Sequence, residues 1–487
     1  MKDSRERQRP KKPAVPNVSQ VAARNQQARR SKPLLDPHGI YGTRTAYRVR
    51  AAQRRQTIQY LCAFGVLLFG AGAFLSWLRA PRIANASAQW SRSLNTLPSA
   101  APVAASSGDA TWILVPTESG KLITLNAASG EPGAVFTTTF PLRGEPVVSG
   151  GQAFVPGEDG ALFAIDWPSG KALWSYRTAS SMSARPALLR IPLPTAQSNQ
   201  TVATTPVADV SSPGTQQLRR VVVVGNDGGE IIALDAGQGK PLWRRKVDAA
   251  VGGALVAVTS TRVAGADTPP LVLVPLMGGL GTRGGLLCLD ARNGHVLWRA
   301  DLRAAHLAAP AVGKPSANGA ESRVFAVGDD GAVFSLDLRT GRRERGGWKT
   351  FMRPLPGLAA DGAVVLRAEP LLKTYSWGTR LFVGGNDGGV RCLDARSGQV
   401  LWTFDAGAPV RCRLRSLRLQ DGTANARDLL VIGNDSSALL AVDARTGDLA
   451  GRFPTGGKAS FSPVVAGNQL LNVADNGQVE AFRLPGR

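Results

Sequence analysis

The sequence has few of the residues that usually build metal centres and disulfide frameworks. The three histidines are scattered along the chain and suggest no metal site: His38, His295 and His306. There are four cysteines and no adjacent Cys-Cys pair. Cys288 and Cys392 occupy equivalent sites of a repeat, two copies apart, beyond the separation of about 7 Å between α-carbons that a disulfide allows. Cys412 could approach Cys392, but the cysteines fit buried small residues better than a framework.

Acidic residues are also scarce, and the shortage is uneven. The chain has 58 Lys and Arg against 35 Asp and Glu, and residues 1–57 hold 15 of the basic residues with 3 acids. Residues 1–56 lack hydrophobic periodicity, so we expect a disordered basic tail. Tyr41 and Tyr47 are the aromatic residues in it that could stack on bases. We therefore expect the tail to rest on anionic lipid headgroups and not to bind nucleic acid.

Residues 57–78 form a run of 22 residues without charge, long enough to cross a hydrocarbon core of about 30 Å. Tyr60 and Trp77 lie near its two ends, where amphipathic rings prefer the membrane interface. The basic excess before the run predicts a single-pass helix in the bacterial inner membrane, with a cytoplasmic N-terminus and a periplasmic remainder. A cleaved signal peptide is the rival interpretation, because Ala84-Asn85-Ala86 resembles a peptidase site. The long preceding segment argues against cleavage, and residues 79–88 would be a short linker.

A repeated sequence motif runs through the rest of the chain. Its clearest form is residues 388–402, preceded by Leu381-Phe382-Val383-Gly384-Gly385-Asn386-Asp387. Further clear copies begin at Gly160, Gly229 and Gly284, and degenerate copies at Gly120, Gly331, Ser437 and Gly477. An irregular period near fifty residues, with a fixed core and variable spacers, indicates blade-type repeats.

Each repeat parses into four strands joined by tight turns. Around Gly160 the strands are expected at residues 145–148, 153–155, 162–165 and 173–176. Asp-Gly and Asn-Gly pairs such as Asp159-Gly160 and Asp387-Gly388 suit tight hairpin turns. A four-stranded antiparallel meander is one blade of a β-propeller.

Three repeat positions predict how blades dock. One position is always small: Thr124, Ala164, Ala233, Cys288, Ser335, Cys392, Ala441 and Ala481. Ten residues later stand Trp174, Trp243, Trp298 and Trp402, and we expect each ring to lie against the small residue of the next blade. An acid follows the small residue by two positions: Asp166, Asp235, Asp290, Asp337, Asp394 and Asp443. The turn after it carries a glycine, as at Gly170, Gly239, Gly294 and Gly398.

The six aligned aspartates have two interpretations. They could bind metal, or they could accept backbone N–H bonds of the turn that follows. Ligands of one ion must converge, and equivalent outer positions on separate blades do not, so turn capping is favoured.

The motif Ala-x-Asp-x-x-(Ser/Thr)-Gly-Lys-x-x-Trp resembles the tryptophan-docking motif of the pyrroloquinoline-quinone (PQQ) repeat family. Residues 164–174 fit every position. Residues 233–243 carry Gln238 at the hydroxyl position, and two copies have cysteine for alanine. Copies at 124–134 and 441–451 lack the tryptophan, and the copy at 335–345 has Trp348 three residues late. The resemblance covers residues 89–483.

The two ends of the array complement each other. The last copy has a third strand and no fourth, whereas Gln89-Trp90-Ser91-Arg92-Ser93-Leu94 looks like an orphan fourth strand with its tryptophan. Pairing them would remove an open sheet edge. The expected fold is therefore all-β, an eight-bladed propeller of four-stranded antiparallel blades over residues 89–487, after a transmembrane helix and a disordered tail.

The resemblance implies two classes of function. Quinoprotein alcohol or glucose dehydrogenases hold PQQ and calcium, with an Asp base, acidic and amide calcium ligands and often a Cys-Cys disulfide. Neither that disulfide nor one convincing base and metal cluster can be placed here, so no catalytic, cofactor or metal residue is assigned. The other class is the non-catalytic, BamB-like propeller of outer-membrane protein assembly, which implies envelope proteins as partners and no cofactor. A ligand-sensing ectodomain of an envelope signalling complex is a further alternative.

Two segments outside the motif are candidates for binding. Residues 191–217, between the first and second strands of the third blade, are rich in Ser, Thr, Pro and Gln and suit a flexible loop or a binding arm. Arg411, Arg413 and Arg415 fall on one side of an expected strand over residues 410–419. They could meet an anionic partner or form a solvated face.

Overall fold

The computed structural model describes residues 87–192, 218–259, 262–263, 266–267, 269–279, 284–314, 322–344, 346–355, 364–419 and 426–484. The predicted tail (1–56), membrane helix (57–78) and most of the linker (79–88) lie outside these residues, as does 193–217 of the predicted binding arm. Within the described part of the chain, no helix is long and apolar enough to cross a bilayer.

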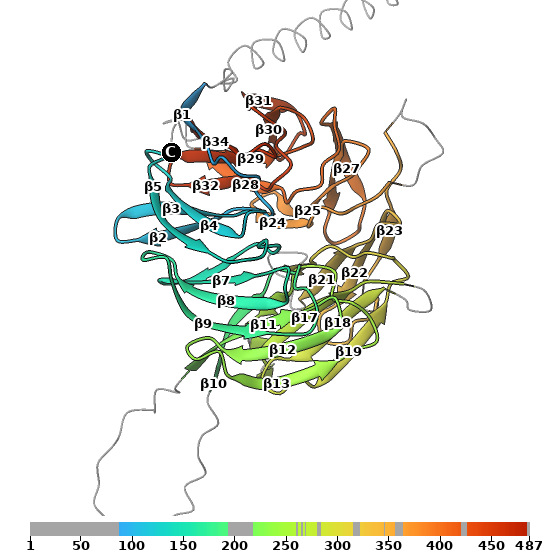
Figure 1. Ribbon diagram of the computed structural model, residues 1–487. Helices are drawn as coiled ribbons and strands as arrows, with labels where there is room; N and C mark the ends of the chain where they lie inside the picture. Colours follow the sequence, from blue (N-terminus) through green and yellow to red (C-terminus); the bar gives the residue numbers. More distant parts are fainter. Residues whose placement is uncertain are drawn as a thin grey trace, which may run out of the picture. The chain divides into compact units, whose positions relative to one another are not determined.

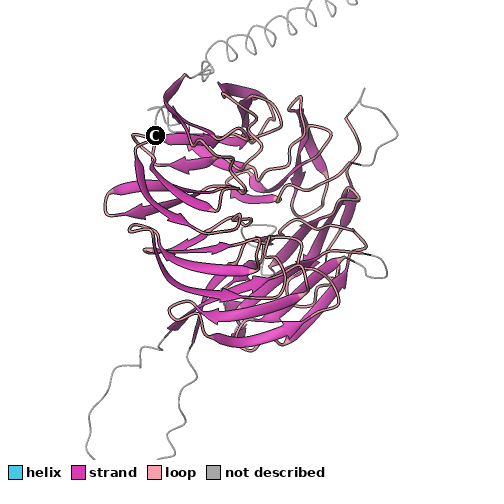
Figure 2. Ribbon diagram, in the orientation of Figure 1, coloured by secondary structure: helices cyan, strands magenta, loops and turns pink. Residues whose placement is uncertain are grey.

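Eight antiparallel sheets of four strands follow one another around a ring (Figures 1 and 2). Blade one is β2 (Val103–Ser107), β3 (Ala110–Pro116), β4 (Lys121–Asn126) and β5 (Pro132–Thr137). Blade two is β6 (Val147–Ser149), β7 (Gln152–Pro156), β8 (Ala161–Asp166) and β9 (Lys171–Arg177). Blade three is β10 (Ala187–Pro192), β11 (Leu218–Gly225), β12 (Glu230–Asp235) and β13 (Pro241–Lys246). Blade four is β14 (Val256–Val258), β17 (Leu271–Leu276), β18 (Gly285–Asp290) and β19 (Val296–Asp301), with the small hairpin β15 (Arg262–Val263) and β16 (Ala266–Asp267) between its first two strands.

The second half repeats the same order. Blade five is β20 (Ala311–Gly313), β21 (Arg323–Val327), β22 (Ala332–Asp337) and β23 (Lys349–Phe351). Blade six is β24 (Leu371–Tyr375), β25 (Gly378–Gly384), β26 (Gly389–Asp394) and β27 (Val400–Asp405). Blade seven is β28 (Arg415–Leu419), β29 (Arg427–Ile432), β30 (Ala438–Asp443) and β31 (Leu449–Pro454). Blade eight is β32 (Val464–Ala466), β33 (Gln469–Val473), β34 (Gln478–Arg483) and, from the other end of the described chain, β1 (Ala88–Ser93).

The closure of blade eight by both ends of the repeat array is confirmed. β1 pairs antiparallel with β34, and Trp90 lies opposite Ala481. The eight-bladed, four-stranded antiparallel propeller predicted from the sequence is therefore the fold of this chain. Because β1 supplies the fourth strand of blade eight, the edge of β34 is paired and cannot recruit a strand of another chain.

Burial follows the position of a strand within its blade. The second and third strands are almost entirely buried, and every residue of β21 and β22 is buried. The fourth strands alternate or face solvent, as β9 does. First strands of neighbouring blades contact one another, for example β2 with β6 and β10 with β14. The first strands therefore line the axis, and the apolar core lies between adjacent blades.

The turn between the second and third strands requires glycine. Gly160 has φ of 74°, and a Cβ placed on it would lie 2.5 Å from the Ser180 carbonyl oxygen. Positive φ and close backbone approach both select glycine here. The strands around Gly160 differ slightly from the prediction, because Glu145 and Pro146 precede β6 instead of belonging to it. Glu145 therefore lies in the segment that leads into the first strand, close to the axis.

Candidate functional site

The tryptophans of the repeat dock onto the turn of the next blade. Trp174 of blade two donates its Nε1–H to the Ala236 carbonyl oxygen of blade three at 3.1 Å. Its ring lies against Gly239, where a Cβ would come within 2.6 Å of ring carbons. Gly239 also has φ of 71°, so glycine is favoured by both backbone conformation and contact.

The same contact occurs at six seams between blades. Donor distances run from 2.9 to 3.3 Å. The pairs of docking tryptophan and turn glycine are Trp90 with Gly130, Trp174 with Gly239, Trp243 with Gly294, Trp298 with Gly341, Trp348 with Gly398, and Trp402 with Gly447. Trp348, three residues late in its motif, thus occupies the docking position. We call these six residues the docking tryptophans.

The small residue of the motif lies elsewhere than expected. Ala164 is the cross-strand neighbour of Trp174 within one blade, not the surface that receives a ring from the blade before. Ala233 and Trp243, Cys288 and Trp298, and Cys392 and Trp402 pair in the same way. A bulge beside each pair accounts for the spacing of ten residues.

The aspartates of the motif hold turns. Asp235 Oδ1 accepts hydrogen bonds from the amides of Gly237 and Gln238 at 2.9 and 3.0 Å. The Asp337, Asp394 and Asp443 carboxylates accept two amides each, Asp290 accepts that of Arg292, and the Ser169 hydroxyl donates to Asp166. Among the described residues no group of three or more His, Cys, Asp or Glu side chains could hold a metal. Each carboxylate therefore serves its own blade.

One seam reverses the arrangement. Blade one has Ala134 where six of the other blades carry a docking tryptophan, and Ala134 lies over Gly170, 3.2 Å from where a Cβ would be. Blade two has Trp167 where other turns carry alanine or leucine; it is fully buried and donates to the Gly150 carbonyl oxygen at 3.1 Å. The large and small residues have exchanged sides, so aromatic volume is kept at this seam.

A groove lies next to this reversed seam. Its cavity of about 410 Å³ has a mixed lining of apolar side chains, among them Phe136, Phe140, Phe163 and Leu173, and of polar ones such as Thr138 and Ser175. Phe140 and Leu173 are 49% and 47% exposed. An ion pair of 2.6 Å between Asp159 and Arg177 borders it.

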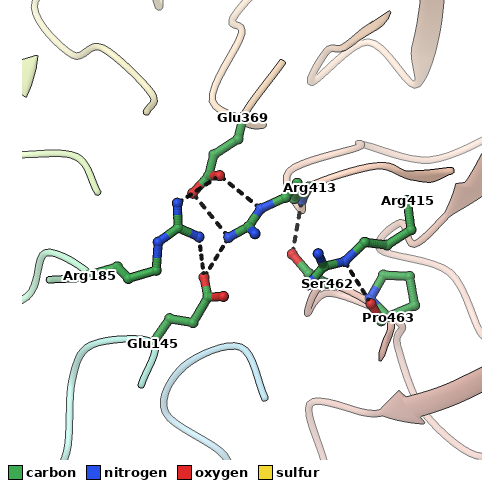
Figure 3. A network of polar contacts seen from close by, with 7 residues as sticks. All are labelled: Glu145, Arg185, Glu369, Arg413, Arg415, Ser462 and Pro463. Carbon is green, nitrogen blue, oxygen red and sulfur yellow. Dashed lines mark hydrogen bonds and ion pairs between the residues drawn. The ribbon is translucent and has the colours of Figure 1, made fainter. Parts of the chain in front are cut away.

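Four charged side chains meet at the axis of the ring. Glu145, Arg185, Glu369 and Arg413 each stand two residues before the first strand of a blade, in blades two, three, six and seven. We call them the axial quartet. Figure 3 shows the two acids and two guanidinium groups pointing toward one another. Equivalent positions converge here because the first strands surround the axis.

The axial quartet is a closed ring of ion pairs. Arg185 reaches Glu145 at 2.9 Å and Glu369 at 3.2 Å. Arg413 reaches the same two acids at 2.7 Å each. The side chains are 14 to 22% exposed, so the pairs are largely withdrawn from water. Two of these contacts, Arg185 with Glu369 and Arg413 with Glu145, join blades that are three positions apart and so cross the centre of the ring.

Burial dominates the titration of the two acids. Desolvation raises the pKa of Glu145 above its usual value, while Arg185 and Arg415 oppose the rise. Desolvation also raises the pKa of Glu369, with Arg185 opposing and the Glu145 carboxylate adding to it. The cost of burial therefore outweighs the stabilisation of the charged carboxylates by their arginines.

The three arginines proposed as a partner-binding set are divided by the structure. β28 begins at Arg415, so Arg411 and Arg413 precede the strand that was expected to align all three. Arg413 is held in the axial quartet, and Arg415 donates from Nε to the Pro463 carbonyl oxygen at 3.0 Å. The side chain of Arg411 is 61% exposed and forms an ion pair of 3.4 Å with Asp435.

The other three members of the axial quartet were missed in the sequence. Glu145, Arg185 and Glu369 each precede a proline that leads into a first strand. The other blades carry Ala101, Ala254, Ala309 and Ser462 at this position. Aligning the copies on the first strand, instead of on the tryptophan motif, would have brought out the alternation of charge.

The described residues do not fit a quinoprotein site at the axis. Calcium needs carboxylate and amide oxygens that are free to coordinate it. Both axial acids are engaged by two guanidinium groups, which would repel a divalent cation. The three described cysteines, Cys288, Cys392 and Cys412, are buried and free, and burial raises their thiol pKa values to about 12.

Together these features define an eight-bladed propeller of PQQ-type repeats, fastened by tryptophans. The chain belongs to the family described as "Outer membrane protein assembly factor BamB", whose model matches residues 77–212, 208–343, 276–384 and 386–484. The protein of that name from Escherichia coli strain K12 is 24% identical over 179 residues, 33% of this chain and 44% of that protein. The curated relatives are matched over 27 to 49% of their own length.

Solved structures with low identity share the fold. BamB from Moraxella catarrhalis superposes with a TM-score of 0.51 at 16% identity, covering 82% of this chain and 97% of that one. A quinohemoprotein alcohol dehydrogenase, ADHIIG from Pseudomonas putida HK5, gives 0.57 at 13% identity, covering 83% and 77%. The two bear on architecture and not on activity.

Proposed function

We propose that this protein is a non-catalytic scaffold that binds proteins of the bacterial cell envelope, including those that assemble outer-membrane proteins. Its family and the names of its curated relatives support this class of role. The observation that carries the non-catalytic part is the axial quartet, whose acids are engaged by arginines at the position where repeats converge. No cofactor is required by the proposal.

The exposed apolar side chains in the groove beside blades one and two support a binding role. Phe140 and Leu173 present apolar surface there. Aromatic side chains such as Phe140 are enriched at the centres of protein interfaces. Arg411 remains a candidate for an anionic partner.

We further propose that residues 57–78 anchor the chain in the inner membrane, with residues 1–56 in the cytoplasm on anionic headgroups and the propeller in the periplasm. The uncharged run and the basic excess before it support this topology. Protease added to intact spheroplasts should spare residues 1–56. Their digestion from outside would contradict the topology.

The rival class is a PQQ-dependent dehydrogenase, and an assay separates the two. Purified full-length protein, given PQQ, Ca²⁺, an artificial acceptor dye and an alcohol or sugar, should reduce no more dye than a sample without protein. Reduction that depends on PQQ would overturn the non-catalytic assignment.

A further inference from the structure

One face of the propeller carries every turn between a third and a fourth strand. Strands alternate in direction, so these turns and the connections from first to second strands share a face, and the other connections lie opposite. We call it the turn face, defined by the turns at residues 126–131, 166–171, 235–240, 290–295, 337–342, 394–399 and 443–448. The aspartates that accept the turn amides, here called the capping aspartates, and the glycines that the docking tryptophans cover lie on this face.

Four consecutive blades place arginine at the same turn position. Arg292, Arg339, Arg396 and Arg445 stand two residues after the capping acid in blades four to seven, and all four are exposed. Blades one to three have Ala128, Pro168 and Gly237 there. In blade one, Asn126 accepts the Ala128 amide at 2.9 Å, the bond that Asp394 makes with Arg396 at 3.1 Å. The turn forms without arginine, so folding does not account for its presence.

Three of these four arginines form no ion pair with a described residue of the chain. Arg292 pairs with Asp290 at 2.6 Å. Arg339, Arg396 and Arg445 have no ion-pair partner among the described residues. Their capping acids have other neighbours: Asp394 pairs with Arg380 at 2.9 Å, and Asp443 lies 3.9 Å from Arg427.

The chain enters the propeller on this same face. β1 is the fourth strand of blade eight, and Ala88, its first residue, lies opposite Phe482 near the end of the third strand. That is where the other blades have their turn. Residue 78 ends the proposed membrane helix, and ten residues reach at most about 36 Å when fully extended. The described chain therefore begins on the face that carries the arginines, and at most that length of chain separates β1 from the proposed helix.

We propose that the turn face of blades four to seven rests on anionic phospholipid headgroups of the membrane that anchors the chain. This inference depends on the topology in the proposed function. Screening limits attraction to about 8 Å at physiological ionic strength, so only a face held close to the bilayer can use its charges. A tether of at most about 36 Å lets the arginines of this face come within the screening distance of the bilayer. The opposite face, where the axial quartet and Arg411 lie, is then left open to the periplasm.

Hydrogen exchange in nanodiscs tests the contact with the full-length protein. Discs of phosphatidylcholine alone are compared with discs containing phosphatidylglycerol. In the anionic discs, amides of residues 337–342, 394–399 and 443–448 should exchange about fivefold more slowly, since each basic residue at an anionic surface contributes on the order of 1 kcal/mol. Equal exchange in the two kinds of disc would overturn the proposal.

Variants separate the turn face from the basic tail. Replacing Arg339, Arg396 and Arg445 by glutamine should abolish the lipid response, and replacing them by lysine should keep it. A matched control changes three exposed basic residues of the opposite face, Lys121, Arg367 and Lys458, to glutamine and should leave the response intact. A response that survives in the first variant would assign it to the tail and refute the contact.

The outcomes also separate this inference from the topology on which it rests. Digestion of residues 1–56 from outside spheroplasts would remove both. A chain with the proposed topology but no lipid-dependent exchange would lose the turn-face contact alone.

Discussion

Trp298 is the docking tryptophan that the structure buries most completely, with 8% of its surface exposed. It donates to the Leu338 carbonyl oxygen at 2.9 Å and covers Gly341. We expect Trp298→Ala to lower the free energy of unfolding by about 3–5 kcal/mol, because a large cavity opens between blades four and five. Trp298→Phe should cost less, since most of the ring remains. Urea unfolding followed by fluorescence measures both.

Leu297 provides the control for Trp298. It is the preceding residue in the same strand but is 47% exposed. Leu297→Ala should change the free energy of unfolding by no more than about 0.5 kcal/mol. Equal losses in Leu297→Ala and Trp298→Ala would show that the seam does not depend on the ring.

The axial quartet should be sensitive to the loss of one acid. Glu369→Gln leaves Arg185 and Arg413 sharing Glu145. Removing one partner of a largely buried pair costs about 3–5 kcal/mol. Glu118→Gln is the control, since its pair with Arg143 is 38% exposed on both sides and should contribute about 1 kcal/mol or less. Similar effects of the two substitutions in urea unfolding would contradict the account.

The axial acids also predict a pH dependence. The folded-state pKa values of Glu145 and Glu369 are raised above 4.5, so the folded protein binds protons more readily than the unfolded chain. Their contribution to stability therefore falls as pH rises from about 4.5 through the raised pKa, and it recovers on acidification through that window. Glu369→Gln should flatten this part of the profile of urea midpoint against pH. An unchanged slope would argue against burial as the dominant effect.

The sequence predicted the residues that join neighbouring blades better than it predicted the residues at the axis. A tryptophan ten residues after a small residue is a local pattern that four copies of the repeat share. Glu145 and Glu369 are far apart in sequence and meet because the ring closes. The sequence around each of these two acids does not indicate which arginines will contact it.

At the scale of elements, β1 is the strand on which closure depends. Trp90 donates to the Ala127 carbonyl oxygen at 3.1 Å and covers Gly130 of blade one. We expect Trp90→Ala to release β1, so that amides of β34 exchange at least tenfold faster, as about 1.4 kcal/mol or more of local stability is lost. Hydrogen exchange resolved to residues 478–483 measures this.

The control for β1 is the exposed neighbour Gln89. Gln89→Ala removes only the acceptor of a 3.0 Å hydrogen bond from Gln469 Nε2, so it should change exchange in β34 far less than Trp90→Ala. Trp90→Ala should leave β18 unchanged because blade four lies opposite blade eight. Uniform acceleration in all blades would mean that the ring unfolds as one unit and that β1 is not a local closure.

The pairing of the two ends was predictable because each lacked what the other supplied. The reversed seam was not. The motif at residues 124–134 reads as degenerate when examined alone, and Trp167 reads as an unusual turn residue. In the structure blades one and two are adjacent, and the large Trp167 on one side of their seam compensates for the small Ala134 on the other. A similar argument holds for residues 441–451, which lack tryptophan: blade eight has no turn of its own in the place where such a ring would dock.

At the scale of the whole molecule, the residues that hold the blades together are distinct from the residues that differ between blades. Docking tryptophans and capping aspartates recur because the blades recur. What is particular to this chain lies where copies differ: the axial quartet, the groove beside blades one and two, and the arginines of the turn face. A scaffold with the turn face on the membrane would present its opposite face to envelope partners.

The central claim is that this propeller binds envelope proteins, and in-cell crosslinking followed by purification of the full-length chain tests it most directly. Envelope proteins, outer-membrane assembly proteins among them, should be recovered at a level comparable to the chain itself. The same experiment on a variant with Leu173→Asp and Phe140→Asp in the groove should recover less of them. Recovery of the chain alone, after crosslinking and gentle extraction, would contradict the account.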